Sequence, residues 1–416
     1  RVPAGLLYVR DAGGPRGGAP VDWNNIAPRV SFAWSPFANR KTSIRAAYGI
    51  FYDTPRFHTL SQFVQSPPFS LQQLVNGPES FSNPYSGRVN PFPYVPPQTD
   101  QERQNYQFLL PALVGLSIDA DLVAAYNQQW NFNLQQELAR DFIVTAAYVG
   151  SKATHLPLDR ELNPAIYRPG ARLNDIDQRR LFPNFQSIVS YEPTAFSSYH
   201  AAQFSVNKRF SKGYTILAHY TYGKTIDVAS TDDAPLQNPL NIAADKALAD
   251  TDVRHRFVTS FLWELPSPFR SGPGNWILGG WQTNGIFTAT SGTPFTVVTG
   301  QDIALAGTGR QRPNLVGTPH LPTDRTREQT ILQYFHPAAF ANPAAGSYGN
   351  AGRNILTGPG AWNLDFALFK NFRVTESAQL SFRWEMFNAF NHANLLNPRS
   401  NINAARPGQI ESATDA

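Results

Sequence analysis

The sequence predicts an all-β fold of about ten long antiparallel strands, and three observations carry this prediction. Apolar and polar residues alternate with a period of two over stretches of about ten residues. These stretches come in pairs that are joined by short turns. Long segments rich in Pro, Gln and Asn separate one pair from the next. Because alternation places one set of residues on each face of a strand, the chain is expected to form five β-hairpins.

The clearest hairpin runs from Ser198 to Lys224. Apolar residues such as Phe204 alternate with polar ones up to a tight connection at Gly213, a residue that tolerates the positive φ of such turns. Tyr220 belongs to the apolar set of the returning arm. Each arm is about twice as long as a usual strand in a soluble protein and matches the roughly 9–11 residues that a tilted strand needs to cross a bilayer.

The same alternation predicts four further hairpins. Three of them each precede a long loop, and the last lies near the end of the chain. In chain order their arms are Arg29–Ser35 with Ile44–Tyr52, Trp130–Glu137 with Phe142–Tyr148, Arg254–Glu264 with Trp281–Ser291, and Trp362–Leu368 with Leu380–Met386.

The connections are sorted by length, which favours one architecture over another. Short turns within the hairpins and long loops between them are typical of a membrane β-barrel, with periplasmic turns and outer loops. A β-sandwich has no reason to sort its loops in this way. We therefore predict a portion of a transmembrane β-barrel with short turns on one rim and long loops on the other. The predicted loops are Asp53–Ala125, Gly150–Ser197, Thr225–Val253 and Pro294–Ala361.

Composition restricts the classes of function. The 416 residues include 34 Pro and 29 Gly, 13% are aromatic and only 16% are charged, which suits aromatic strands joined by loops. No apolar run of about eighteen residues occurs, so no transmembrane helix is expected. The absence of cysteine excludes disulfides, thiol catalysis and zinc–thiolate sites. The net charge of +5 is small and scattered, so no nucleic-acid partner is expected.

In a membrane barrel the apolar face contacts lipid and the polar face lines a wet lumen. We expect aromatic residues near strand ends, such as Trp130, Tyr222, Trp281 and Trp362, to form interfacial girdles. The apolar face is predicted to carry Ile44, Tyr48, Phe132, Phe204, Tyr220, Phe366, Phe382 and Trp384.

Ten polar side chains on the lumen side are candidates for contact with a substrate or an internal plug. Solvation of a wide lumen and cross-strand ion pairing is the alternative for each of them, and the one we favour. The candidates are Arg45, Gln135, Glu137, Gln203, Asn207, Arg209, His219, Asp365, Arg383 and Glu385.

No catalytic constellation or cofactor motif is present, so an enzyme is not expected. Gly223-Lys224-Thr225 lacks the preceding glycine and following helix of a phosphate-binding loop. His255 lies between two arginines and is interpreted as membrane-edge or lumen charge. The acidic loop after the third hairpin offers Asp227, Asp232 and Asp233 as a candidate calcium site. It has no EF-hand spacing, and we favour solvated loop charge.

Several stretches, in order along nearly the whole chain, match one family. In these residues the chain resembles the barrel domain of Oar-like TonB-dependent receptors. The resemblance implies a barrel of about 22 strands in the bacterial outer membrane, an internal plug, coupling to the TonB complex and a transported or bound substrate. The stretches include PRVSFAWSPF (28–37), YNQQWNFNLQQEL (126–138), YTYGKTID (220–227), GGWQTNGIFTATSGTPFTV (279–297) and LSFRWEMFNAFNHANL (380–395).

The chain departs from this family pattern in two ways. It contains no plug or TonB box, and it ends at GQIESATDA (408–416), without a last strand that closes on an aromatic residue. Since it also begins without Met or a signal peptide, we expect residues 1–416 to be a partial barrel domain. Its outer strands, at 29–35 and 379–388, should then not pair with each other.

Three functions compete at this stage. The first is TonB-coupled transport or reception of an unknown substrate, and the second is surface adhesion through long loops without transport. The third is a soluble β-rich binding or enzyme domain, in which the apolar faces of the strands would meet in an enclosed core.

Overall fold

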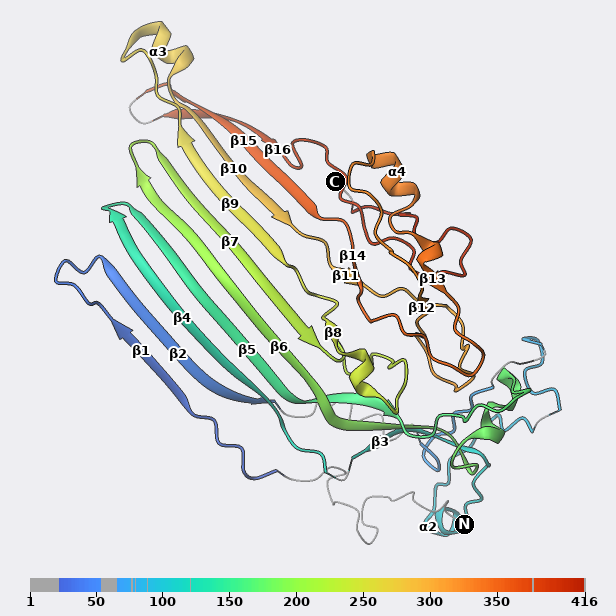
Figure 1. The fold of residues 1–416 in the computed structure, drawn as a ribbon. Helices are drawn as coiled ribbons and strands as arrows, with labels where there is room; N and C mark the ends of the chain where they lie inside the picture. Colours follow the sequence, from blue (N-terminus) through green and yellow to red (C-terminus); the bar gives the residue numbers. More distant parts are fainter. Residues whose placement is uncertain are drawn as a thin grey trace.

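The computed structural model describes residues 22–53, 66–75, 78, 80–87, 89–119, 121–375 and 378–414. One large antiparallel sheet dominates it (Figure 1). Each strand of this sheet pairs with its neighbours in the following order, which is also their order in the chain. The strands are β1 (Arg29–Trp34), β2 (Thr42–Asp53), β4 (Ala125–Ala139), β5 (Phe142–Glu161), β6 (Phe185–Ser211), β7 (Tyr214–Asp227), β9 (His255–Glu264), β10 (Trp281–Thr290), β15 (Ala361–Arg373) and β16 (Gln379–Met386).

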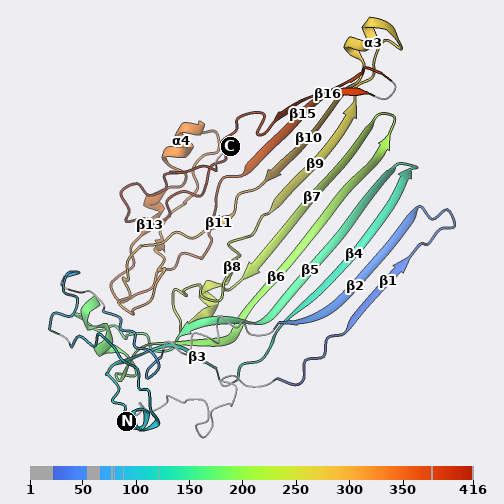
Figure 2. The same ribbon diagram turned by 180° about the vertical axis from the view of Figure 1, so that it is seen from behind.

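The five predicted hairpins are confirmed, because these ten strands pair as β1–β2, β4–β5, β6–β7, β9–β10 and β15–β16. β1 pairs with β2 and β16 with β15, and within the described residues no ladder joins β1 to β16. The sheet is therefore open, as predicted for its two outer strands. The hairpin turns lie at one end of the sheet and the long connections at the other (Figure 2).

Smaller elements decorate the two ends. Most of them lie at the end with the long connections, whereas α3 lies among the hairpin turns (Figure 1). These elements are α2 (Asp100–Gln104), β3 (Ala112–Ile118), η2 (Leu173–Arg179), η3 (Ile242–Asp245), β8 (Ala247–Leu248), α3 (Gly272–Leu278), β11 (Pro294–Phe295), β12 (Asn314–Leu315), α4 (Arg327–Leu332), η4 (Pro337–Ala339), β13 (Phe340–Ala341) and β14 (Leu356–Thr357). No helix in the described part of the chain is long and apolar enough to cross a membrane.

The register of the ladders builds one continuous apolar face. Phe204 lies opposite Tyr220, with stacked rings whose centroids are 6.5 Å apart, and Tyr220 lies opposite Phe257. On the far side of β6, Phe204 lies opposite Ala146, which in turn faces Leu134. Since side chains alternate between faces, this register brings apolar residues of successive strands onto the same side.

The side chains of this face are not enclosed. Phe132, Phe204 and Phe382 are 48%, 52% and 55% exposed. Buried hydrophobic clusters occur instead among the long connections, for example around Phe335 and around Leu158. A soluble domain would have covered the apolar strand face in its core. The exposed arrangement is the one that a sheet in lipid requires.

Strands β5 and β6 are longer than predicted, and the predicted loop 150–197 is wrong over much of its length. β5 continues to Glu161 and β6 begins at Phe185. The alternation is lost in these extensions because neither face lies in lipid, while the backbone ladder continues. A bulge with His155 at φ 57° accommodates Pro157, which has no N–H to donate.

The predicted loop 53–125 also contains an unforeseen strand. β3 pairs with β6 in parallel, and its buried residues Ala112, Val114 and Leu116 alternate with less buried ones. Ala112 and Val114 pack against Phe185. With seven residues, this strand lacks the length that identified the other strands.

Candidate functional site: the polar face and the loop rim

The ten polar residues predicted for the lumen side share one face of the sheet but form no single cluster. They are spread over six strands, from Arg45 on β2 to Glu385 on β16. Cross-strand partners show the shared face: Arg45 lies opposite Asn133, and His219 lies opposite Ser205. The face is therefore a broad polar surface rather than a compact catalytic arrangement.

Some of these ten side chains have defined contacts. Asp365 accepts hydrogen bonds from the Asn363 side chain at 2.9 Å and from the backbone N–H of Asn388 at 2.9 Å. The Arg383 guanidinium lies 5.4 Å from the ring centroid of Phe369 on the adjacent strand. These contacts hold the side chains of Asp365 and Arg383 in place on the polar face, beside the edge of the sheet.

Charged side chains converge at the rim that carries the long connections. Asp227, the last residue of β7, is buried and forms an ion pair with Arg353. The same guanidinium lies 3.1 Å from Asp250, and Ser230 donates to Asp227 at 2.7 Å. Arg353 thus joins two segments that are more than a hundred residues apart in the chain.

A second buried pair joins the same two segments. The Arg312 guanidinium forms an ion pair with Asp245 and donates to the carbonyl oxygen of Ala351 at 2.7 Å. The side chain of Gln237 accepts from the backbone N–H of Arg312 at 2.8 Å and donates to the carbonyl of Gly349 at 2.9 Å. The acidic loop and the 294–361 segment are therefore held together by buried, hydrogen-bonded groups.

The interpretation of the acidic loop as solvated charge is wrong for three of its carboxylates. Asp227, Asp245 and Asp252 are 4%, 2% and 3% exposed, and each has an arginine partner. Two of those arginines, Arg353 and Arg312, come from a distant segment, which local spacing could not reveal. Asp227 is occupied by its arginine, and in the described ranges no group of three or more His, Cys, Asp or Glu could hold a metal ion.

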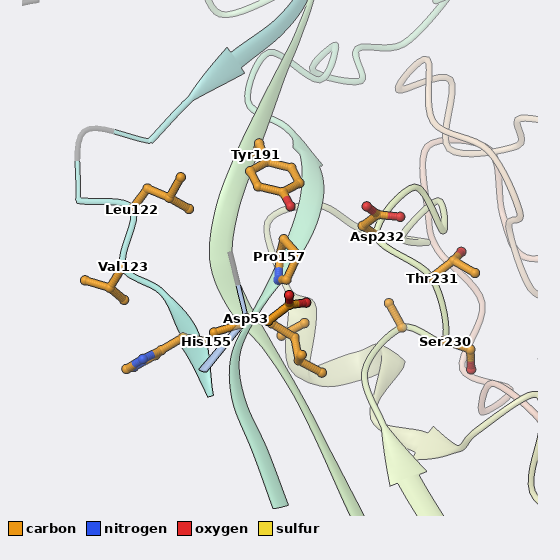
Figure 3. A pocket seen from close by; sticks show the side chains of 13 residues that line it. Asp53, Leu122, Val123, His155, Pro157, Tyr191, Ser230, Thr231 and Asp232 are labelled. Carbon is orange, nitrogen blue, oxygen red and sulfur yellow. The ribbon is translucent and has the colours of Figure 1, made fainter. Parts of the chain in front are cut away.

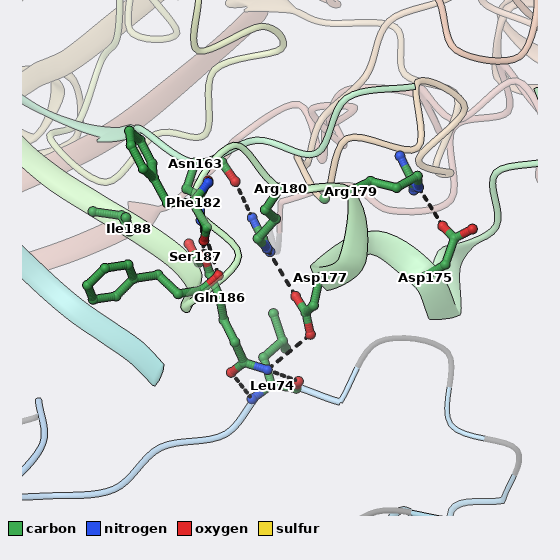
Figure 4. A network of polar contacts seen from close by, with 12 residues as sticks. Leu74, Asn163, Asp175, Asp177, Arg179, Arg180, Phe182, Gln186, Ser187 and Ile188 are labelled. Atoms are coloured by element: carbon green, nitrogen blue, oxygen red, sulfur yellow. Dashed lines mark hydrogen bonds and ion pairs between the residues drawn. The ribbon is translucent and has the colours of Figure 1, made fainter. Parts of the chain in front are cut away.

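A third network ties the start of β6 to the 162–184 connection (Figure 4). The Arg180 side chain is buried and lies 3.0 Å from Asp177. Gln186 donates to Asp177 at 3.1 Å and to the carbonyl of Leu74 at 3.0 Å, and it accepts from the Leu74 N–H at 3.2 Å. Buried Asn163 donates to the carbonyl of Gln186 at 2.8 Å. These contacts organise the rim above β5 and β6.

A cavity of about 230 Å³ opens at this rim (Figure 3). Its walls include His155 and Pro157 of β5, Tyr191 of β6 and Asp232 of the loop after β7. Asp159, two residues beyond Pro157, donates its backbone N–H to the carbonyl of Asp232 at 2.8 Å. The sequence pattern did not indicate this cavity, because five segments from different parts of the chain meet to form it.

The carboxyl group of Asp159 is electrostatically unusual. Burial, together with the nearby carboxylates of Asp232 and Asp233, raises its pKa to about 6. Its Oδ1 atom is buried and makes no hydrogen bond. The residue lies well beyond the apolar band of β5, on the part of the strand that rises into the loop rim. Its charge therefore changes in mildly acidic conditions.

Two further motifs considered in the sequence, Gly223-Lys224-Thr225 and His255, lie within strands of the sheet. Lys224 and its neighbours belong to β7, so no phosphate-binding loop is formed there. His255 lies opposite Tyr222, and its Nδ1 is 2.8 Å from the hydroxyl of Tyr220. It is exposed, and its position in the ladder puts it on the apolar face. Of the two roles considered from the sequence, this position fits charge at the membrane edge rather than charge in the lumen.

Comparison with known proteins gives one sequence match and a group of structural matches. Residues 2–416 match the family described as "Outer membrane beta barrel domain". No curated protein is significantly similar in sequence. The outer membrane transporter YddB from Escherichia coli is similar in structure, with a TM-score of 0.50 and 10% identity over 94% of this chain. The siderophore receptor PirA from Acinetobacter baumannii has a TM-score of 0.43, 10% identity and 94% coverage. This chain spans 39% and 40% of their respective lengths.

Proposed function

The chain belongs to the outer membrane beta barrel domain family, and from this premise we propose that it forms part of the barrel of an Oar-like TonB-dependent transporter or receptor. The observation that carries the proposal is the two-faced sheet, whose register aligns apolar residues on one side and polar residues on the other across ten strands. In an outer membrane this arrangement supplies a lipid-facing wall and a hydrated interior.

We further propose that the ten polar residues line the path or binding surface of a substrate, or contact an internal plug. They span most of the width of the sheet, from β2 to β16, as a lining would. The proposed role is binding and passage rather than bond-making chemistry, since the face presents dispersed Arg, Glu, Asn and Gln side chains. Coupling to the TonB complex is part of the proposal and is drawn from the family resemblance.

The experiment compares the producing bacterium with a strain that lacks this protein and with a strain depleted of TonB. Growth and uptake are measured over a panel of limiting nutrients, and attachment to surfaces is measured in parallel. The transport proposal expects the deletion and the TonB depletion to share the loss of uptake of at least one nutrient. Loss of attachment with unchanged uptake in the deletion strain would instead establish the adhesion alternative.

Variants of the polar face make the same test site-specific. Replacing Arg45 and Arg383 together with Glu should lower uptake without lowering the amount of protein in the outer membrane. The matched control is the change of Arg399 and Arg406 to Glu, because these lie outside the ten-strand sheet and alter the charge equally. Equal uptake by both variants would contradict the assigned role of the polar face.

A further inference from the structure

The apolar face carries an unexpected group of basic side chains at its loop end. Lys152 of β5, His200 of β6 and Lys224 of β7 occupy this face, together with His255 of β9, and all four are exposed. The register assigns the face: His200 lies opposite both Gly150 and Lys224, and these positions continue the apolar set two residues beyond Tyr148, Ala202 and Tyr222.

Aromatic rings organise this basic patch. The Tyr148 hydroxyl lies 2.7 Å from Nδ1 of His200, and the Tyr220 hydroxyl lies 2.8 Å from Nδ1 of His255. When a tyrosine hydroxyl donates to Nδ1, the neutral imidazole carries its proton on Nε2 and can donate outward. The Trp130 ring covers Gly150 and lies 5.9 Å from the His200 ring. The imidazoles of His200 and His255 are thus held by neighbouring aromatic side chains.

No carboxylate balances the two lysines on this face. Over residues 126–136, 142–154, 198–208, 214–226 and 255–263 the apolar side of the described strands carries neither Asp nor Glu. The lysine at the other end of the same face behaves differently, because Lys208 is buried and its ammonium donates to the carbonyl oxygen of Arg209 at 2.6 Å. The loop-end lysines therefore remain available for an anion outside the protein.

The depth of the patch corresponds to a bilayer surface. His200 and Lys208 are eight positions apart on β6. At about 3.3 Å per residue and a strand tilt of roughly 40°, they span about 20 Å of membrane thickness, close to the apolar band of such barrels. Lys152 and Lys224 are two strands apart, which separates their backbones laterally by about 10 Å. This places both ammonium groups at headgroup level.

We propose that Lys152, His200 and Lys224 bind the phosphate groups of an anionic lipid in the outer leaflet of the outer membrane. The lipid is the favoured occupant because the patch is continuous with the exposed apolar face: acyl chains would cover Phe204 and Tyr220 while the headgroup phosphate meets the lysines. Basic side chains next to a membrane-facing surface attract anionic lipids in this way. The inference rests on the proposed placement of this face in lipid, and not on transport.

The test measures lipid preference with the whole protein extracted from its outer membrane and returned to vesicles. Quenching of tryptophan fluorescence by brominated phosphatidic acid is compared with quenching by brominated phosphatidylcholine. The signal of Trp130 is obtained as the difference from a Trp130→Phe protein. The expected result is a preference for phosphatidic acid that weakens with added salt and is unaffected by inorganic phosphate, which distinguishes lipid from free anion.

The informative variant is Lys152→Gln with Lys224→Gln, which should lower the preference at least about tenfold. Lys41→Gln with Lys212→Gln is the control, because it removes the same charge from exposed positions at the turn rim and should leave the preference unchanged. Lys152→Arg with Lys224→Arg should retain the preference. Equal preference in the Gln and unaltered proteins, or an equal loss in the control, overturns the proposal. An unchanged lipid preference in a protein that fails the uptake test would leave this inference standing and the transport proposal refuted.

Discussion

Arg353 forms an ion pair with Asp227, which closes a contact between the end of a sheet strand and a connection that follows much later in the chain. Both side chains are largely buried, with 11% and 5% of their surface exposed. Removing only one partner of such a pair strongly destabilises the fold, because the remaining charge stays buried where water solvates it poorly. The rim therefore depends on the pair as a unit.

Replacing Arg353 with Met is expected to destabilise the loop rim by about 3–5 kcal/mol, since Asp227 would be left buried without its cation. Limited proteolysis of the loops and denaturant unfolding measure the effect. The control is Arg399→Met, which breaks an ion pair with Glu411 whose side chains are 38% and 47% exposed. Exposed pairs contribute only about 0–1 kcal/mol, so similar losses in the two variants would contradict the structure.

The two faces of β6 should respond differently to a new charge. Phe204→Arg is expected to impair insertion into lipid vesicles by roughly 2–4 kcal/mol, because a cation at the bilayer midplane is poorly solvated. Phe382→Arg should behave likewise. Asn207→Arg, on the opposite face of β6, should have a milder effect. Equal yields of folded protein from the Phe204 and Asn207 variants would refute the assignment of the faces.

Gly150 should not tolerate a side chain. A Cβ atom at this position would lie 2.3 Å from the Trp130 ring, so Gly150→Ala must displace the indole. We expect a loss of about 1–3 kcal/mol from this overpacking, together with a shift of tryptophan emission. Gly352→Ala is the control, because a Cβ atom at that position would meet nothing within 4 Å. An unshifted emission spectrum in the Gly150 variant would show that Trp130 lies elsewhere.

Asp159 should make stability depend on pH. Its pKa is about 6 in the folded chain, against an ordinary value of 3.8. Between these values the folded state holds more protons than the unfolded state, so this group's contribution to stability falls as pH rises through that window. Asp159→Asn should flatten that fall, as measured by the denaturant midpoint at about pH 4.5 and 7.5.

The control for this dependence is Asp100→Asn, which removes a carboxylate whose side chain is 90% exposed. It should leave the difference between the two midpoints as it is in the unaltered protein. An Asp159→Asn protein that loses as much stability between the two pH values as the unaltered one would contradict the assigned pKa.

The sheet could be predicted from sequence because lipid imposes a strict period of two on the strands that cross it. Phe204 and Tyr220 are apolar for that reason, and the alternation also identified the polar face. The parts of β5 and β6 that lie among the long connections carry no such pattern, since neither of their faces lies in lipid. Only their backbone ladder shows that they are strands.

The rim could not be predicted for a different reason. Arg353 and Asp227 are 126 residues apart, and Gln186 reaches a partner 112 residues away. Contacts of this separation follow from the folded topology and leave no local spacing in the chain. The aromatic and basic residues around His200 could each be seen in the sequence. Their common face emerged only from the register of β5, β6 and β7.

The long pairing of β5 with β6 also has a mechanical consequence. Its ladder runs from Phe142 opposite Lys208 near the turn rim to Glu161 opposite Val189 among the loops. A pull on the 162–184 connection loads both strands in the same direction, so the rungs between them can stay paired while the force is carried along this ribbon towards the membrane. The bulged segment around His155 interrupts the regular rungs, so the upper and lower parts of the ribbon are joined there by fewer backbone hydrogen bonds.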